Sequence, residues 1–101
     1  MFSFFALFAR REPEPAPLPQ NPREWGMDLL HPWLETMDHR NPEHRERVEK
    51  KLEVLEQAIW HEAKHRFASL EEVFEASPAS LPVHLRVYRE MHEYMRLWLT
   101  L

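Results

Sequence analysis

The longest regular alternation of apolar and polar positions in this chain lies between residues 41 and 67. Four aliphatic residues follow one another there at spacings of four, three and four: Val48, Leu52, Leu55 and Ile59. This spacing places them on one face of an α-helix. Asn41 and Pro42, just before, are typical of a helix start, because Asn caps free N–H groups and Pro fits the first turn. The pattern predicts one helix over residues 41–67.

A second helical pattern precedes this segment. Large apolar residues recur there every four positions: Trp25, Leu29, Trp33 and Met37. Asn21 and Pro22 predict where this helix begins, for the same reasons as at Asn41. Pro32 lies inside the pattern and has no backbone N–H to donate, so we expect a kink, or two short helices that meet near His31.

The last helix is predicted from Pro82 to the end of the chain, and it has two apolar seams. The first seam consists of His84, Tyr88, Met91, Met95 and Trp98. The second seam consists of Val83, Val87, Tyr94, Leu97 and Leu101. Together they are wider than the contact that one neighbouring helix makes, which predicts a helix that is packed on two sides.

Residues 69–72, Ser-Leu-Glu-Glu, have the spacing of a capping box and predict a short helix over residues 70–76. The chain contains one Gly and nine Pro, and it lacks the Asn-Gly and Asp-Gly pairs that form tight hairpins. We therefore predict an all-α fold, a small helical bundle of three main helices and one short helix. Residues 23–101 are expected to form it as a single domain.

Two segments of different composition precede this domain. Residues 1–11 are nearly all apolar up to Arg10 and include four phenylalanines: Phe2, Phe4, Phe5 and Phe8. This stretch is too short to span a bilayer, so we expect it to pack on the helices, to lie on a membrane surface or to contact another protein. Residues 12–22 hold five of the nine prolines, which predicts an extended spacer.

Charge and composition narrow the classes of function. Thirteen basic and 17 acidic residues give a net charge of −4, which disfavours binding to nucleic acid through its phosphates. The chain has no cysteine, so a disulfide framework and a thiolate metal site are excluded. We expect a cytoplasmic protein, with residues 1–11 as the candidate for peripheral membrane contact. Protonation of all seven histidines would add seven charges to −4 and give +3, so a pH-dependent oligomeric state is a further hypothesis.

One short motif has a chemical mechanism attached to it, His61-Glu62-Ala63-Lys64-His65. Two histidines four residues apart on a helix can take two positions of a tetrahedral zinc ion, and the Glu between them can deprotonate a bound water. The five residues resemble the active-site helix of zincin metallopeptidases. The resemblance implies that His61 and His65 are zinc ligands and that Glu62 is the general base, with Glu71 or Glu72 as a carboxylate ligand. Against this resemblance we expect a polar helix face that holds no cofactor, and a structural or adventitious metal site is a further alternative.

The apolar surface of the last helix favours a different function. Five of its residues are of types that dominate the energetics of protein interfaces: Tyr88, Met91, Tyr94, Met95 and Trp98. Packing inside the bundle is the simpler interpretation for most of them, yet a chain of this size cannot easily enclose all its apolar surface. We therefore expect an interaction or accessory protein that binds a protein partner or a second copy of itself. A minimal zinc-dependent hydrolase is the alternative.

Overall fold

Every regular element formed by residues 17–101, the part of the chain that the computed structural model describes, is a helix. In chain order the elements are η1 (Pro22–Glu24), α2 (Met27–Glu35), α3 (Pro42–Ala63), α4 (Leu70–Glu75), η2 (Pro78–Ser80) and α5 (Val83–Leu99). The predicted all-α bundle of three main helices and one short helix is confirmed. The predictions for residues 1–11, with Phe2, Phe4, Phe5 and Phe8, lie outside the described residues, as do residues 12–16 of the spacer.

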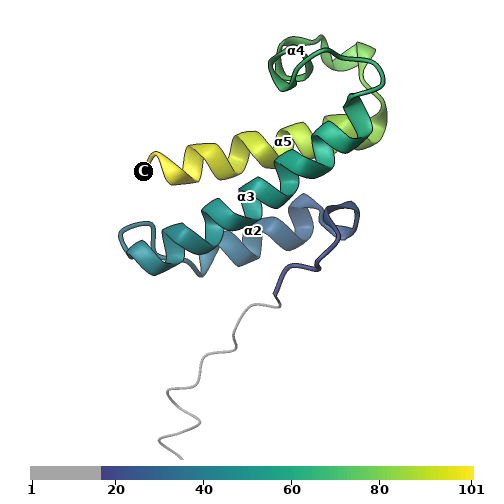
Figure 1. Cartoon of the computed structure of the whole chain (residues 1–101). Helices are drawn as coiled ribbons and strands as arrows, with labels where there is room; N and C mark the ends of the chain where they lie inside the picture. Colours follow the sequence, from purple (N-terminus) through teal and green to yellow (C-terminus); the bar gives the residue numbers. More distant parts are fainter. Residues whose placement is uncertain (1–16) are drawn as a thin grey trace, which may run out of the picture.

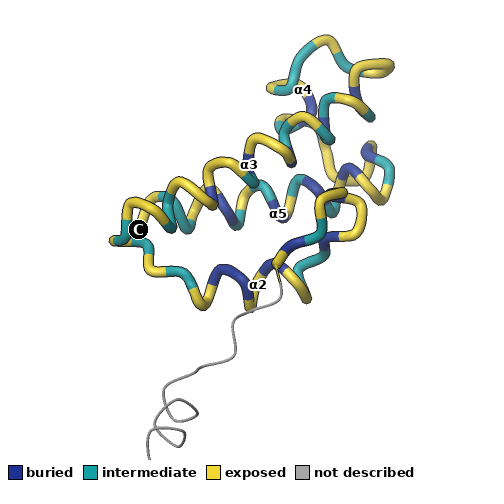
Figure 2. The backbone as a smooth tube through the Cα atoms, turned by 60° about the horizontal axis from the view of Figure 1, so that its bottom comes forward, coloured by how far each residue is buried: buried dark blue, intermediate teal, exposed yellow. Residues whose placement is uncertain are grey.

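The helices α3 and α5 form the closest pair, and α2 lies beside them (Figure 1). The short helix α4 stands at the end of this pair where α3 stops and α5 begins. Buried residues lie on the sides of the helices that face one another, and the outer sides are exposed (Figure 2). The bundle therefore has one core, which all three main helices share.

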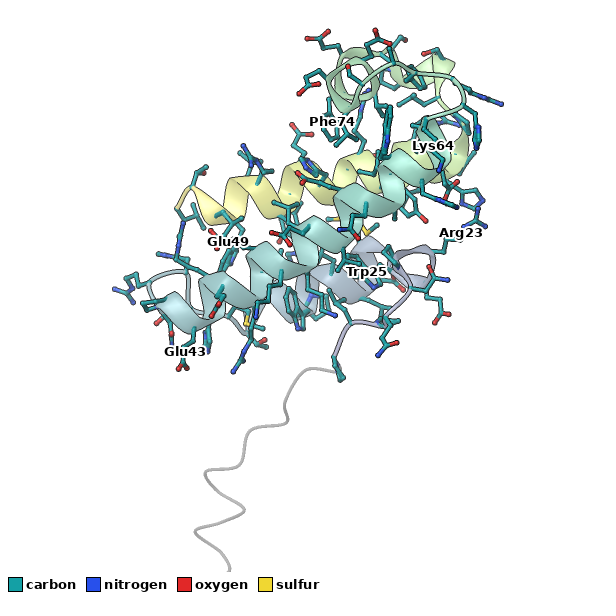
Figure 3. All side chains as sticks on the ribbon, viewed as in Figure 1. Arg23, Trp25, Glu43, Glu49, Lys64 and Phe74 are labelled. Atoms are coloured by element: carbon teal, nitrogen blue, oxygen red, sulfur yellow. The ribbon has the colours of Figure 1, made fainter. Side chains whose placement is uncertain are left out.

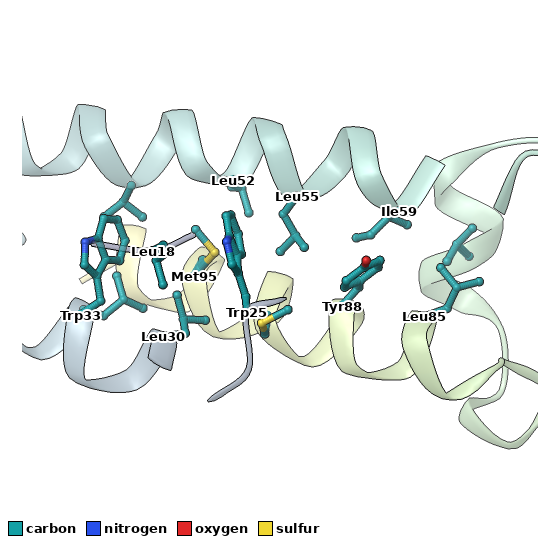
Figure 4. Packing of buried hydrophobic residues seen from close by; sticks show 14 of the residues in the cluster. Leu18, Trp25, Leu30, Trp33, Leu52, Leu55, Ile59, Leu85, Tyr88 and Met95 are labelled. Atoms are coloured by element: carbon teal, nitrogen blue, oxygen red, sulfur yellow. The ribbon is translucent and has the colours of Figure 1, made fainter. Parts of the chain in front are cut away.

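The predicted seam of the central helix is the middle of this core. Val48, Leu52, Leu55 and Ile59 are all buried, and Ala63 continues the row. From the other helices the core receives Leu30, Trp33 and Leu34 of α2, and Leu85, Tyr88, Met91 and Met95 of α5. Figure 4 shows side chains of all three helices meeting between the ribbons, among them Leu30 of α2, Leu55 of α3 and Tyr88 of α5. The helical spacing read from the sequence thus identifies the buried face of α3.

The segment before α2 is fastened to the bundle by Trp25. This side chain is buried, and its indole N–H donates a hydrogen bond of 2.5 Å to the carbonyl of Pro19. The ammonium of Lys51 lies 5.8 Å from the centroid of the Trp25 ring, within the range of a cation–π contact. Leu18 is buried in the same region. Trp25, one of the large apolar residues that recur every four positions in the sequence, is therefore a core residue.

The start of the first long helix differs from the prediction. Asn21 does act as a cap, because its side chain accepts the N–H of Arg23, but only the single turn of η1 follows, and α2 begins at Met27 after an extended Gly26. Of the two alternatives at Pro32, a kink or two short helices that meet near His31, the second is wrong: one helix runs through Pro32. A proline inside a helix removes one backbone hydrogen bond, and the burial of three large side chains of α2 offsets that loss.

The ends of α3 and α5 also come earlier than predicted. The long helix stops at Ala63 instead of residue 67, and residues 64–66 form a turn in which the N–H of Phe67 bonds to the Ala63 carbonyl at 2.9 Å. The last helix stops at Leu99. There the guanidinium of Arg45 donates to the Leu99 carbonyl at 2.6 Å, which satisfies one of the free acceptors of the helix end.

Side chains form hydrogen bonds with backbone groups at both ends of the short helix α4. At its start the Oγ of Ser69 accepts from the N–H of Glu72 at 3.3 Å, as the capping box predicts. The carboxylate of Glu72 accepts in turn from the N–H of Ala68 at 3.1 Å. At its other end Arg89 of α5 donates to three carbonyls, those of Val73, Phe74 and Ala76. A helix of this length depends on such contacts, because its own hydrogen bonds are few.

Replacement of a seam residue should cost far more stability than replacement of its neighbour. Leu55→Ala is expected to lower the free energy of unfolding by about 2–5 kcal/mol, because it leaves a cavity in the core. Val54 is 37% exposed, and Val54→Ala should change the same quantity by no more than about 0.5 kcal/mol. Urea unfolding followed by circular dichroism measures both. Equal losses for the two variants would contradict the assigned core.

Loss of the Arg89 guanidinium should loosen α4. Arg89→Met keeps the apolar stem but removes three hydrogen bonds, at an expected cost of about 1–3 kcal/mol. Amide hydrogen exchange of residues 70–76 should become faster, since that helix then has unsatisfied carbonyls. Arg86→Met is the matched control, because Arg86 is exposed on the same helix. Similar exchange rates in the two variants would show that Arg89 does not hold α4.

Candidate functional site

The predicted zinc motif straddles the end of α3. His61 is exposed in the last turn of the helix, and His65 is exposed in the turn that follows it. The two histidines therefore do not share one helix, which corrects the basis of their predicted pairing. Glu71 and Glu72 are exposed on α4, where the Glu72 carboxylate caps the helix. Within residues 17–101 no three His, Asp or Glu side chains form a group that could hold a metal ion.

The glutamate between the two histidines has a structural partner. The carboxylate of Glu62 lies 3.3 Å from the Nε of Arg23, and only 19% of the Glu62 side chain is exposed. Arg23 belongs to η1, and Figure 3 shows it at the end of the bundle where Lys64 lies. This ion pair connects the segment before α2 to the end of α3. The assignment of Glu62 as a general base stays a prediction from the sequence, as does a bound zinc ion.

The same carboxylate faces a buried phenol. Tyr88 of α5 is buried, and within the described part of the chain its hydroxyl has no hydrogen-bond partner. Burial, followed by the negative charge of Glu62, raises the pKa of Tyr88 to about 12. The structure thus brings together Glu62 from the zinc motif and Tyr88 from the predicted partner-binding set. No spacing in the sequence could have indicated that contact, because 26 positions separate the two residues.

The predicted partner-binding residues divide into two groups. Tyr88, Met91 and Met95 are buried between α5 and its neighbours, so they are core residues and not a surface for a partner. The prediction that these three residues form a partner-binding surface is corrected: they pack inside the bundle, which was the simpler interpretation. Tyr94 and Trp98 are partly buried at the edge of the core. Only these two of the five can still be reached from outside the bundle.

The second seam of α5 remains largely uncovered. The exposed fractions of Val83, Leu97 and Leu101 are 62%, 59% and 71%. Val87 and Tyr94 complete the seam and are partly buried. We call these five residues the outer face of α5. Its exposed leucines and valine are large apolar side chains for which the described residues supply no cover.

The helix α2 reaches only one edge of the outer face. The Nδ1 of His31 lies 2.5 Å from the hydroxyl of Tyr94, and the Nε2 of His31 lies 3.2 Å from a carboxylate oxygen of Glu35. Both ring nitrogens of His31 are thereby engaged. The contact orients the Tyr94 ring and does not involve Leu97, farther along the helix, or Leu101, just past its end.

Sequence reasoning missed a groove of about 560 Å³ between α2, α3 and the segment before η1. Its walls are formed by Pro17, Leu18, Trp33, Thr36, Met37, His44, Arg47, Lys50 and Lys51. Three of its four titratable groups are Arg or Lys, and none is acidic. The sequence does place Arg47, Lys50 and Lys51 at helical spacing. That spacing does not indicate that they share a groove with Trp33 and Met37.

Comparisons with known proteins supply no relative for this arrangement. No protein-family model matches the chain, and no curated protein or solved structure is significantly similar to it. A separate finding concerns membranes: among the helices built from residues 17–101, none combines the length and apolar character that crossing a bilayer needs. Function therefore has to be argued from the residues themselves.

The raised pKa of Tyr88 predicts a specific loss of stability in alkali. The fold favours the neutral phenol, so its stabilising effect is complete below about pH 10 and is lost as the pH rises to about 12. The free energy of unfolding should fall there by up to about 1.4 kcal/mol per pH unit from this group alone.

Tyr88→Phe tests this without a large cost at neutral pH, because the hydroxyl that it removes has no hydrogen bond within the described residues. Urea unfolding of both proteins at several pH values above 9 gives the comparison. As the pH rises, the free energy of unfolding of Tyr88→Phe should increasingly exceed that of the wild type. A constant difference would show that Tyr88 titrates as an ordinary tyrosine.

Proposed function

We propose that this chain is a protein-binding module that acts through the outer face of α5, with a second copy of the chain as the partner on that face. The observation that carries the proposal is the exposure of Val83 and Leu97 on α5, and of Leu101 just past its end, while other residues of the same helix fill the core. Large apolar side chains exposed in a row along one side of a helix are typical of interaction sites.

The spacing along the outer face favours a helix as the surface that covers it. Positions 83, 87, 90, 94, 97 and 101 follow at intervals of four, three, four, three and four, and all but one of them are apolar or aromatic. Alternating steps of four and three residues are the pattern by which two helices pack along their length. Glu90 is the exception, and a carboxylate in such a seam weakens the contact.

Energetic arguments support self-association of moderate strength. Complete burial of an exposed Leu or Val contributes about 1.5–3 kcal/mol, and a two-fold symmetric contact buries each of these residues twice. The loss of rotational and translational freedom offsets a large part of that gain. We therefore expect a dimer that dissociates on dilution.

Leu97→Glu is the variant that tests the proposal. The change removes an exposed leucine from the outer face and adds a second carboxylate to the seam that already holds Glu90, so association should be lost. Sedimentation velocity at about 0.5 mM chain should show a dimer for the wild type and a monomer for the variant. Val54→Glu is the matched control, since Val54 is also partly exposed but lies on α3.

The control variant should sediment like the wild type, and both variants should keep the helical circular dichroism of the native chain. A wild-type protein that stays monomeric at that concentration would contradict self-association. Identical behaviour of Leu97→Glu and Val54→Glu would show that any dimer forms through a different surface.

A further inference from the structure

The groove between α2 and α3 lies away from the outer face of α5 and has a different chemical character. Its apolar part is formed by Leu18, Trp33 and Met37, on the α2 side and at the segment that precedes η1. Figure 4 shows Leu18 and Trp33 between the ribbons of α2 and α3. At about 560 Å³ the groove has the size of an ordinary ligand site in a protein.

The α3 side of the groove is basic. Arg47 is exposed and forms no hydrogen bond or ion pair with any residue that the structure describes. Lys50 has only a long contact of 3.9 Å to Glu46, and both side chains are largely exposed, so the pair contributes little. Lys51 lies over the Trp25 ring. These three positive charges line a groove to which residues 17–101 contribute no acidic side chain.

The fourth titratable group in the lining is His44, and in its neutral form it offers the groove a hydrogen-bond donor. The Nδ1 of His44 accepts the backbone N–H of Asp38 at 2.9 Å. The ring proton of the neutral imidazole must then be on Nε2, where it is available as a donor. All the titratable groups of the groove therefore offer positive charge or N–H donors to a ligand, and none offers a carboxylate.

We propose that this groove binds an extended acidic segment of a partner protein in which acidic and large apolar residues alternate. Side chains of an extended peptide point alternately to opposite sides, so acids would meet α3 and apolar groups would meet Trp33 and Met37 of the α2 side. Arg47 and Lys51 are four residues apart, about 6 Å along the helix. Carboxylates two residues apart in an extended peptide are separated by about 6.6 Å, a close match to that rise.

This proposal is independent of the outer face of α5, because none of the groove residues belongs to α5. A single small anion would use the charges but leave the apolar wall unfilled. A peptide with both kinds of side chain uses both walls, and that is why we infer a peptide and not a free anion.

The test uses the full chain and the acetylated peptide Glu-Leu-Glu-Phe-Glu, with Lys-Leu-Lys-Phe-Lys as its counterpart. The chain has four tryptophans, whose indole N–H signals in a nitrogen-15 spectrum report on separate places. The acidic peptide should shift the signal of Trp33 in the groove and leave that of Trp60, at the α3 and α4 junction, unchanged. The basic peptide should shift neither.

Arg47→Glu should weaken the binding of the acidic peptide by about tenfold or more, because it reverses the least compensated charge of the groove. Arg86→Glu makes the same charge change on the exposed side of α5 and should alter the affinity by less than about twofold. Arg47→Gln removes the charge without adding a new one and should lie between the two. Raising the salt concentration from about 50 to about 500 mM should weaken the binding of the wild type.

Three results would overturn the proposal. The first is an unchanged Trp33 signal at saturating peptide, and the second is an equal effect of Arg47→Glu and Arg86→Glu. The third concerns Glu12 and Glu14, acids of the same chain that come shortly before Pro17 in the sequence. If the full chain with Glu12→Gln and Glu14→Gln binds the peptide about tenfold more tightly, the chain's own acids compete for the groove, and its ligand is intramolecular.

Discussion

The apolar seam of α3 is the interaction on which the other elements depend. Its residues from Val48 to Ala63 form a single narrow row, and η1, α4 and α5 all pack against the helix that carries it. Because the row is narrow, α5 lies directly on it, while α2 is joined to it through the large side chains of Trp25 and Trp33. One apolar seam of α5 packs against this row. The second seam is left over because the chain has no further long helix among residues 17–101 to place on it.

Arginines from elsewhere in the chain bind the carbonyls at the ends of α4 and α5. Spacing on the helices predicts pairs of opposite charge four residues apart, and Glu46 with Lys50 is one that forms. Arg89 instead donates to the carbonyls at the end of α4, and Arg45 does so at the end of α5. A guanidinium gains more from two or three aligned carbonyls that are partly shielded from water than from one exposed carboxylate. Connections between helices therefore take precedence over pairs within them.

How much of the fold and of the candidate site could be predicted from the sequence depends on how far apart in the chain the interacting residues lie. The seam of α3, the cap at Ser69 and the role of Trp25 follow from local spacing, and they are correct. Helix ends were misjudged where a contact from elsewhere in the chain decides them, as at Leu99. The partner-binding set failed for Tyr88, Met91 and Met95 because a pattern of period 3.6 shows that a face is apolar but not which neighbour covers it. The groove was missed because its two walls belong to different elements of the chain, and one wall is apolar and the other is basic.

The two proposed surfaces rest on different physical forces, and this has a consequence for how they can act together. The outer face of α5 is apolar, so salt should leave its association intact or strengthen it, whereas the groove depends on charges that salt screens. The two share no residue, and the core seam of α3 lies between the helices that carry them. Occupation of one would therefore leave the geometry of the other unchanged. A chain that dimerises through α5 would present two grooves, and a partner with two acidic segments would bind such a dimer far more tightly than it binds a monomer.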